Sequence, residues 1–109
     1  MSENSTSFAE FWPKYLAAHA DARNRVSHYC GTAMGVLLLI AFLAGVGWWL
    51  LPVALVAGYG PAWAGHALFE RNRPATFDHP LWSFIGDFRM LFLAATGELH
   101  AERERLGLC

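Results

Sequence analysis

The sequence predicts an all-α fold, that of a small integral membrane protein built on a two-span helical hairpin. Its 109 residues suit a single domain. Of these, 55% are hydrophobic and 16% charged, whereas an average soluble domain has about 25% charged residues. No Asp, Glu, Lys or Arg occurs among the 44 residues from Val26 to Phe69. Because a surface helix of a soluble protein needs a polar face, this run indicates two membrane helices and a turn.

The composition excludes two other classes of protein. The chain is too apolar and too aromatic to be disordered. Its net charge of −1 offers no basic surface for a nucleic acid, so none is expected as a partner. A cleaved secretory signal is disfavoured as well, because the apolar run starts only near residue 30 and no short, positive leader precedes it.

The N-terminal segment, residues 7–28, is predicted to be an amphipathic helix on the membrane surface that carries a His/Asn motif. Ser7 and Glu10 have the spacing of a capping box. Pro13 requires either a kink or a helix whose regular part starts near Trp12. The apolar face consists of aromatic and aliphatic side chains, namely Phe8, Phe11, Trp12, Tyr15 and Leu16.

The membrane hairpin is predicted to cover residues 31–69, with spans at about 31–46 and 52–69. Gly45, Gly47 and Pro52 bracket the turn, since Gly loosens a helix and Pro starts one more readily than it continues one. Trp48 and Trp49 lie in this turn, where amphipathic rings suit the headgroup layer.

Basic residues on both sides of the hairpin predict its orientation. They are Lys14, Arg23 and Arg25 before it and Arg71 and Arg73 after it. The positive-inside rule then puts both termini of a multi-pass protein in the cytoplasm, in the plasma membrane of a bacterium or the endoplasmic reticulum of a eukaryote. Cys30 and Cys109 have no metal or redox spacing and are expected to be free thiols. A hairpin with one further helix is small for a membrane enzyme, which leaves a homo-oligomer open.

The C-terminal part is predicted to contain a loop, a third helix and a polar tail. The loop, residues 70–80, is kept extended by Pro74 and Pro80. Residues 81–97 have apolar side chains at helical spacing, interrupted by Asp87 and Arg89, which suits an interfacial or re-entrant helix. The tail, residues 98–109, alternates acidic and basic side chains and is expected to be a solvated helix.

Four histidines lie at or near the ends of the predicted membrane elements: His19, His28, His66 and His79. The hairpin returns His66 to the membrane surface at which the first span begins. His66 and Glu70 are four residues apart and would share one face of an α-helix. His19 and His28 are nine residues apart, about 180° of rotation, so both can reach one ion only if the chain bends near residues 20–25.

Such a set of imidazoles and a carboxylate, with an open position, suits non-haem iron, and zinc is an alternative. A histidine inside a span is costly unless it has a partner, which favours a functional role for His66. The other residues have structural alternatives. His28 would cap the membrane edge, His79 would start a helix and Glu70 would pair with Arg73.

The motifs on both sides of the hairpin resemble one family. Before the hairpin stands Tyr15-Leu-Ala-Ala-His19, followed by Asn24 and His28. After it stands the block Gly65-His66-Ala-Leu-Phe69-Glu70-Arg71-Asn72-Arg73-Pro74-Ala75. Both are similar to the membrane 2-hydroxy fatty acid dioxygenases, whose fungal member metabolises phytosphingosine to odd-numbered fatty acids. The resemblance extends over residues 8–97, and the present chain is a short form.

The resemblance implies an iron(II) enzyme that uses O2 to shorten a 2-hydroxy fatty acid by one carbon. Its histidines correspond to His19, His28 and His66, to which we add His79 because of its proximity. The remaining predicted site residues are Asn24 and Glu70 for catalysis, Arg71 and Arg73 for the substrate carboxylate, and Phe88 for the acyl chain. Two alternatives stay open: a non-catalytic membrane protein with a structural metal or polar cluster, and a zinc-dependent lipid hydrolase.

Overall fold

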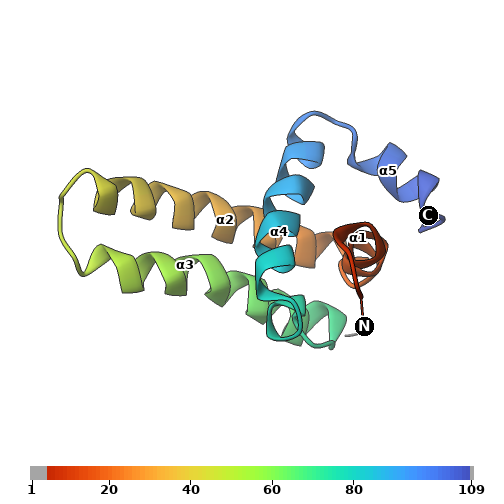
Figure 1. Ribbon diagram of the computed structural model, residues 1–109, viewed down its shortest axis with the longest axis horizontal. Helices are drawn as coiled ribbons and strands as arrows, with labels where there is room; N and C mark the ends of the chain where they lie inside the picture. The colour runs from red at the N-terminus through yellow and green to blue at the C-terminus, as the bar shows by residue number, and fades with distance from the viewer. Residues whose placement is uncertain (1–4, 109) are drawn as a thin grey trace.

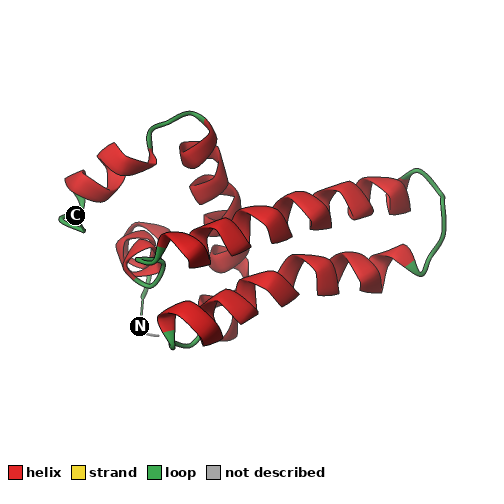
Figure 2. Cartoon of the chain, turned by 180° about the vertical axis from the view of Figure 1, so that it is seen from behind, coloured by secondary structure: helices red, strands yellow, loops and turns green. Residues whose placement is uncertain are grey.

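The structure, a computed structural model, describes residues 5–108. Within this range the regular secondary structure is helical, and no strand is present (Figure 2). The elements are α1 (Phe8–Ala17), α2 (Ala22–Leu43), α3 (Leu50–Gly65), the π-helical turn η1 (His66–Glu70), the 3₁₀ turn η2 (Ala75–Phe77), α4 (Pro80–Ala95) and α5 (Leu99–Arg105). The predicted all-α fold is confirmed for the described part of the chain.

Helices α2 and α3 form an antiparallel hairpin, and its turn includes Gly45 at a φ of 84° (Figure 1). Glycines bring the two backbones close together. A Cβ atom on Gly31 would lie 2.5 Å from the carbonyl oxygen of Gly58, and one on Gly35 would lie 3.3 Å from its Cα. Small residues at a helix contact are typical of membrane proteins, in which close backbone packing replaces the hydrophobic effect.

The hairpin exposes most of its apolar surface. Helix α2 is the one described helix that is long and apolar enough to cross a membrane, with a mean hydropathy of 1.8 and only 11% of that window buried. Helix α3 is shorter but continues into η1 without a break. The exposed apolar side chains include Leu37, Ile40 and Leu43 on α2, Val53, Leu55 and Val56 on α3, and Trp48 and Trp49 in the turn.

The buried core lies at the opposite end of the hairpin from its turn. Helix α4 crosses α2 and α3, and α1 and α5 lie beyond this crossing (Figure 1). Aromatic and aliphatic side chains of α1 are fully buried there together with Met90 of α4. The indole N–H of Trp12 donates to Glu102 at 2.7 Å, which attaches α5 to α1.

Residues 7–28 form two helices instead of the single amphipathic helix that we predicted. Helix α1 ends at Ala17 and runs through Pro13, and the Ser7 hydroxyl caps it by accepting from the N–H of Glu10 at 3.2 Å. Asp21 then starts α2 by accepting from the N–H of Arg23 at 2.8 Å. Because of this cap, the first hairpin helix begins at Ala22 and not at residue 31, and the predicted bend is present.

The C-terminal elements agree with the expected order but not with a fully solvated tail. Helix α4 covers most of residues 81–97, and Gly97 ends it at a φ of 78°. Helix α5 does not lie free in solvent, since Leu99 joins the buried core and Glu102 binds Trp12. The alternating charges of the tail gave no sign that Leu99 would pack into the core.

Candidate metal centre

Three histidines from separate segments converge in the core. His19 comes from the link between α1 and α2, His28 from the first turns of α2, and His66 from η1. Their exposed fractions are 1%, 5% and 1%. The Nε2 atom of His19 lies 3.2 Å from that of His28 and 3.1 Å from that of His66. One ring nitrogen of each histidine lies within 4.8 Å of the other two, a spacing that suits a single metal ion.

The outer nitrogen of each ring faces an oxygen atom. His19 Nδ1 lies 2.6 Å from the carbonyl oxygen of Tyr15, and His66 Nδ1 lies 2.5 Å from Oδ1 of Asn72. His28 Nδ1 lies 3.5 Å from a carboxylate oxygen of Asp87. Metal-binding histidines usually have such an oxygen partner behind the ring, because it fixes the tautomer and the orientation.

These partners determine which nitrogens carry a proton. A carbonyl oxygen only accepts, so His19 Nδ1 donates to Tyr15. The amide of Asn72 donates through Nδ2 to the carbonyl of Ala18 at 3.0 Å, which turns its Oδ1 to His66 and makes His66 Nδ1 a donor. The Nε2 atoms of His19 and His66 therefore present lone pairs to each other, an arrangement that a bound cation stabilises.

The burial of His19 and His66 disfavours their protonation and so leaves their ring nitrogens free to bind a metal ion. It lowers the pKa of His19 well below its usual value, and the neighbouring His28 and His66 lower it further. Burial also lowers the pKa of His66. Neutral imidazoles are the form that binds metals, so the donor set fits a divalent transition metal.

The π-helical turn orients His66. The carbonyl of His66 accepts from the backbone N–H groups of Arg71 and Asn72, and Arg71 adopts a left-handed conformation with a φ of 56°. This turn brings the Asn72 side chain back to the His66 ring. Turns of π-helix occur frequently at functional sites, and this one shapes the centre directly.

A protein-family model described as "2-hydroxy-palmitic acid dioxygenase Mpo1-like" matches residues 5–99. The chain belongs to the Mpo1-like family. The resemblance noted in the sequence is thereby confirmed, and the matched range contains all three clustered histidines. No curated protein and no solved structure matches the chain.

Two predicted site residues of this Mpo1-like chain, Asn24 and Glu70, lie near the histidine cluster but do not belong to it. The Glu70 carboxylate accepts from the backbone N–H of Asp21 at 2.7 Å and from Nδ2 of the buried Asn24 at 3.3 Å. Glu70 and Asn24 thus hold the link that carries His19. The expectation that Glu70 shares a face with His66 assumed an α-helix, and the π-helical turn changes that relation.

The structure does not bring His79 to the cluster, contrary to its prediction as a ligand. Its ring stacks on Trp82 with centroids 4.9 Å apart and meets the ring of Phe11 edge-on at 5.5 Å. His79 directly precedes α4 and packs among aromatic rings. Its position next to the motif loop misled the prediction.

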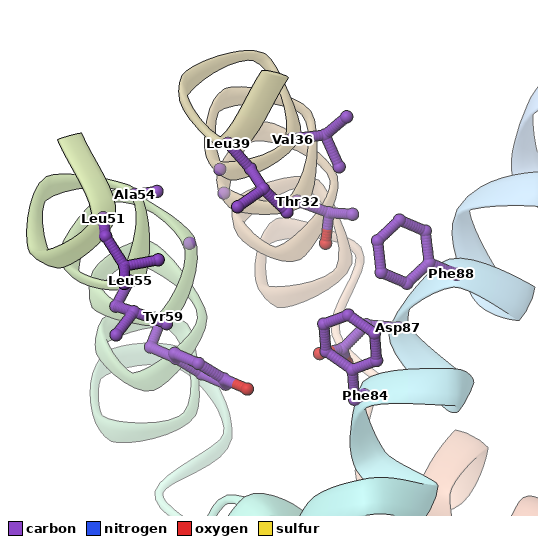
Figure 3. A pocket seen from close by; sticks show the side chains of 13 residues that line it. Thr32, Val36, Leu39, Leu51, Ala54, Leu55, Tyr59, Phe84, Asp87 and Phe88 are labelled. Atoms are coloured by element: carbon purple, nitrogen blue, oxygen red, sulfur yellow. The ribbon is translucent and has the colours of Figure 1, made fainter. Parts of the chain in front are cut away.

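The remaining predicted residues of the Mpo1-like chain lie outside the histidine cluster. Arg71 is exposed, and Arg73 pairs with Asp78 at 3.3 Å. Phe88 lines an apolar groove between α2, α3 and α4 (Figure 3). Cys30 is an exposed free thiol, and Cys109 lies outside the described residues.

Three partners of the histidines were not predicted, namely Tyr15, Asn72 and Asp87. The sequence places Tyr15 on an apolar face and at the start of the first motif, without a polar role, but its hydroxyl donates to Asp87, and burial raises its pKa, so it stays protonated. Asp87 carried a usable signal, because an acidic residue within an apolar helix is costly without a partner. The Gly31-x-x-x-Gly35 spacing was a similar signal for close helix packing.

Proposed function

We propose that this protein is an iron(II)-dependent dioxygenase that shortens 2-hydroxy fatty acids by one carbon. One observation carries the proposal: three buried imidazoles bring one ring nitrogen each within 4.8 Å of one another, in a chain that belongs to a family named for a dioxygenase. The overall reaction consumes a 2-hydroxy acid and O2 and yields the shorter acid, CO2 and water. The bond between C1 and C2 breaks, C2 becomes the new carboxyl carbon, and O2 accepts the four electrons that the two carbons lose.

The type of reaction favours iron over zinc. Three histidines with an open position occur in zinc sites as well, so the donor set alone does not separate the two metals. Zinc has no redox chemistry, whereas a reaction with O2 requires a metal that exchanges electrons. Iron(II) held by His19, His28 and His66 would supply that exchange. This argument disfavours the zinc-dependent lipid hydrolase.

The charges around the centre suit a monocarboxylate as substrate. The three imidazoles are neutral in their metal-binding form, and Asp87 contributes one negative charge behind His28. Glu70 and Arg25 also act on the clustered histidines, with opposite charges. A divalent ion would add two positive charges to this buried site, and the carboxylate of a fatty acid would offset part of them. The exposed Arg71 and Arg73 would attract the same carboxylate from outside, as the sequence suggested.

The residues around the histidines hold them in place for this reaction. Tyr15 and Asn72 each keep one ring in the orientation that turns its Nε2 inward, and Asp87 lies 3.5 Å behind the ring of His28. Asn24 and Glu70 fix the link between α1 and α2 that carries His19, so their contribution to catalysis is through its position. The near-complete burial of the rings excludes bulk water, which strengthens electrostatic contacts with a bound substrate.

We further propose that the hairpin lies in a lipid bilayer as two membrane spans. The exposed apolar side chains of α2, α3 and their turn support this, because a surface patch of this kind is unfavourable in water. Helices α1 and α5 both lie at the end away from the turn (Figure 1), so both flanks would be on the cytoplasmic side. The reaction would then take place at the membrane surface where its lipid substrate dissolves.

The burial of the three histidines favours one alternative, a structural metal site without catalysis. Structural sites are closed, and this cluster connects three separate segments of the chain. In that case a metal would raise the melting temperature without any turnover. The two functions are separated by measuring stability and product on the same preparation.

The test of the proposal is anaerobic purification in detergent, loading with iron(II), and addition of O2 with 2-hydroxypalmitate. We expect pentadecanoic acid and CO2 in equal amounts, and one iron per chain. His66→Ala should remove both the iron and the product, since it deletes one of three ligands. His79→Ala is the matched control, because this histidine lies outside the cluster, and it should retain the iron. A chain fully loaded with iron that yields no shorter acid would contradict the proposed reaction.

A further inference from the structure

An apolar groove runs along the hairpin on the side that α4 crosses. Its floor is formed by small residues, Gly31, Gly35, Ala54 and Gly58, where the two helix backbones meet. Larger side chains line its walls, among them Leu39, Leu51, Leu55, Phe84 and Phe88 (Figure 3). Most of them are apolar.

One end of this groove lies at Asp87, behind the ring of His28. Asp87 lines the groove and lies 3.5 Å from Nδ1 of His28, one of the clustered histidines. Gly31 follows His28 by nearly one turn of α2 and also lines the groove. Apart from Thr32, the polar groups of the lining, those of Asp87 and Tyr59, are therefore at this end.

The other end points toward the turn of the hairpin. Leu39 of α2 and Leu51 of α3 line the groove there. From Gly31 to Leu39 the groove follows α2 for about 12 Å, at the 1.5 Å rise of an α-helix. It is open along one side, since 54% of Leu55 and 49% of Phe84 are exposed.

We propose that this groove binds the acyl chain of the substrate and that its far end, at Leu39 and Leu51, sets the preferred chain length. The inference rests on the proposed function, which provides a 2-hydroxy fatty acid as the ligand. The apolar lining has the chemistry of the alkyl tail of such a molecule, and its charged head would lie beyond Asp87, toward the histidine cluster. The open side lets the tail enter sideways from a bilayer, and the glycine floor leaves room for methylene groups.

The first experiment compares two neighbouring substitutions on α2. Leu39→Trp blocks the far end of the groove, whereas Leu37→Trp makes the same change on the outer surface, where Leu37 is 63% exposed and does not line the groove. With 2-hydroxy acids of ten to eighteen carbons, Leu39→Trp should lower activity on long chains relative to short ones by about 10-fold, as expected for two methylenes at about 0.8 kcal/mol each. Leu37→Trp should leave the chain-length profile unchanged. Equal profiles for the two variants would overturn the inference.

The second experiment detects binding without turnover. A 2-hydroxypalmitate with a diazirine at the end of its chain is photolysed with the metal-free protein, and the labelled peptides are identified by mass spectrometry. Label at Leu39 and Leu51 that unlabelled 2-hydroxypalmitate displaces supports the groove, even if no product is ever formed. In that case the groove stands and the proposed reaction fails. Label spread over outward residues such as Leu37 and Val56 would mean that the tail lies only in the detergent or lipid, and would overturn the inference.

Discussion

At the scale of single residues, Asp87 connects α4 to the metal centre. Its carboxylate accepts from the Tyr15 hydroxyl and faces Nδ1 of His28 at 3.5 Å. Removal of such a partner behind a metal ligand typically costs 10- to 100-fold in metal affinity. Asp87→Asn should therefore weaken metal binding by about 10- to 100-fold while the helices persist, as measured by competition with a chelator.

The matched control for this variant is Asp78→Asn. Asp78 pairs with Arg73 and lies outside the histidine cluster, so its loss of charge should leave the affinity for metal unchanged. If Asp87→Asn binds metal as tightly as the unaltered chain, then Asp87 does not orient His28. Circular dichroism of both variants checks that the helical content is retained.

At the scale of elements, the contact between α2 and α3 depends on backbone proximity. A Cβ atom on Gly31 would lie 2.5 Å from the carbonyl oxygen of Gly58, and a backbone atom cannot move away as a flexible side chain does. Gly31→Ala should therefore force the helices apart and lower the free energy of unfolding by about 1–3 kcal/mol, the usual cost of overpacking. Thermal unfolding in detergent measures the change.

Gly60→Ala is the matched control on the same hairpin. A Cβ atom on Gly60 would have no neighbour within 4 Å, and Gly60 lies inside α3. The added methyl group should change the unfolding free energy less than Gly31→Ala does, because the helix preference of Ala is offset by its contact with the ring of Pro61, which follows it. A loss of stability in Gly60→Ala as large as that in Gly31→Ala would show that the close approach is not the cause.

The attachment of α5 to α1 should depend on pH. Hydrogen bonds from Arg105 and then Trp12 lower the pKa of Glu102 below its ordinary value of 4.5. A carboxyl group whose pKa is lower in the folded state stabilises the fold above its unfolded pKa, and this contribution is lost as the pH falls through the folded value. The melting temperature should therefore fall between pH 5 and pH 3, in part because Glu102 becomes protonated.

The substitution Glu102→Gln tests this dependence. It should lower the melting temperature at pH 7, and its difference from the unaltered chain should shrink toward zero at pH 3. Glu98→Gln, at an exposed position just before α5, is the control and should change neither quantity. A constant difference across the pH range would mean that the charge of Glu102 does not attach α5.

The sequence predicted the elements better than the contacts between them. The charge-free run indicated the hairpin, because membrane helices can be recognised from local composition. The chain reversal of the hairpin then implied that His66 returns to His28. Asp87 reaches His28 from the distant helix α4, and Asn72 reaches His66 through the π-helical turn, and no periodicity encodes either contact. The π-helical turn at His66 was not predicted either, because the helical spacing assumed 3.6 residues per turn.

At the scale of the whole molecule, the histidine cluster and the turn of the hairpin lie at opposite ends. The longest extent is 44 Å. The histidine cluster, α1 and α5 lie at one end, and the turn with Trp48 and Trp49 lies at the other (Figure 1). The 22 residues of α2 are about 33 Å long, close to the 30 Å of a bilayer core. In the proposed membrane arrangement, the polar first turns of α2 would lie at the near surface.

This arrangement predicts that the turn of the hairpin reaches the far side of a membrane. In a chain with Cys30→Ser and Cys109→Ser, a single cysteine is introduced either at Val46 in the turn or at Thr96 before α5, both exposed positions. In sealed vesicles of uniform orientation, a membrane-impermeant maleimide should label Val46→Cys from one side only and Thr96→Cys only from the other. Labelling of both from the same side would contradict a spanning hairpin. Labelling of Val46→Cys from neither side, but only after detergent is added, would indicate a hairpin that enters the bilayer without crossing it.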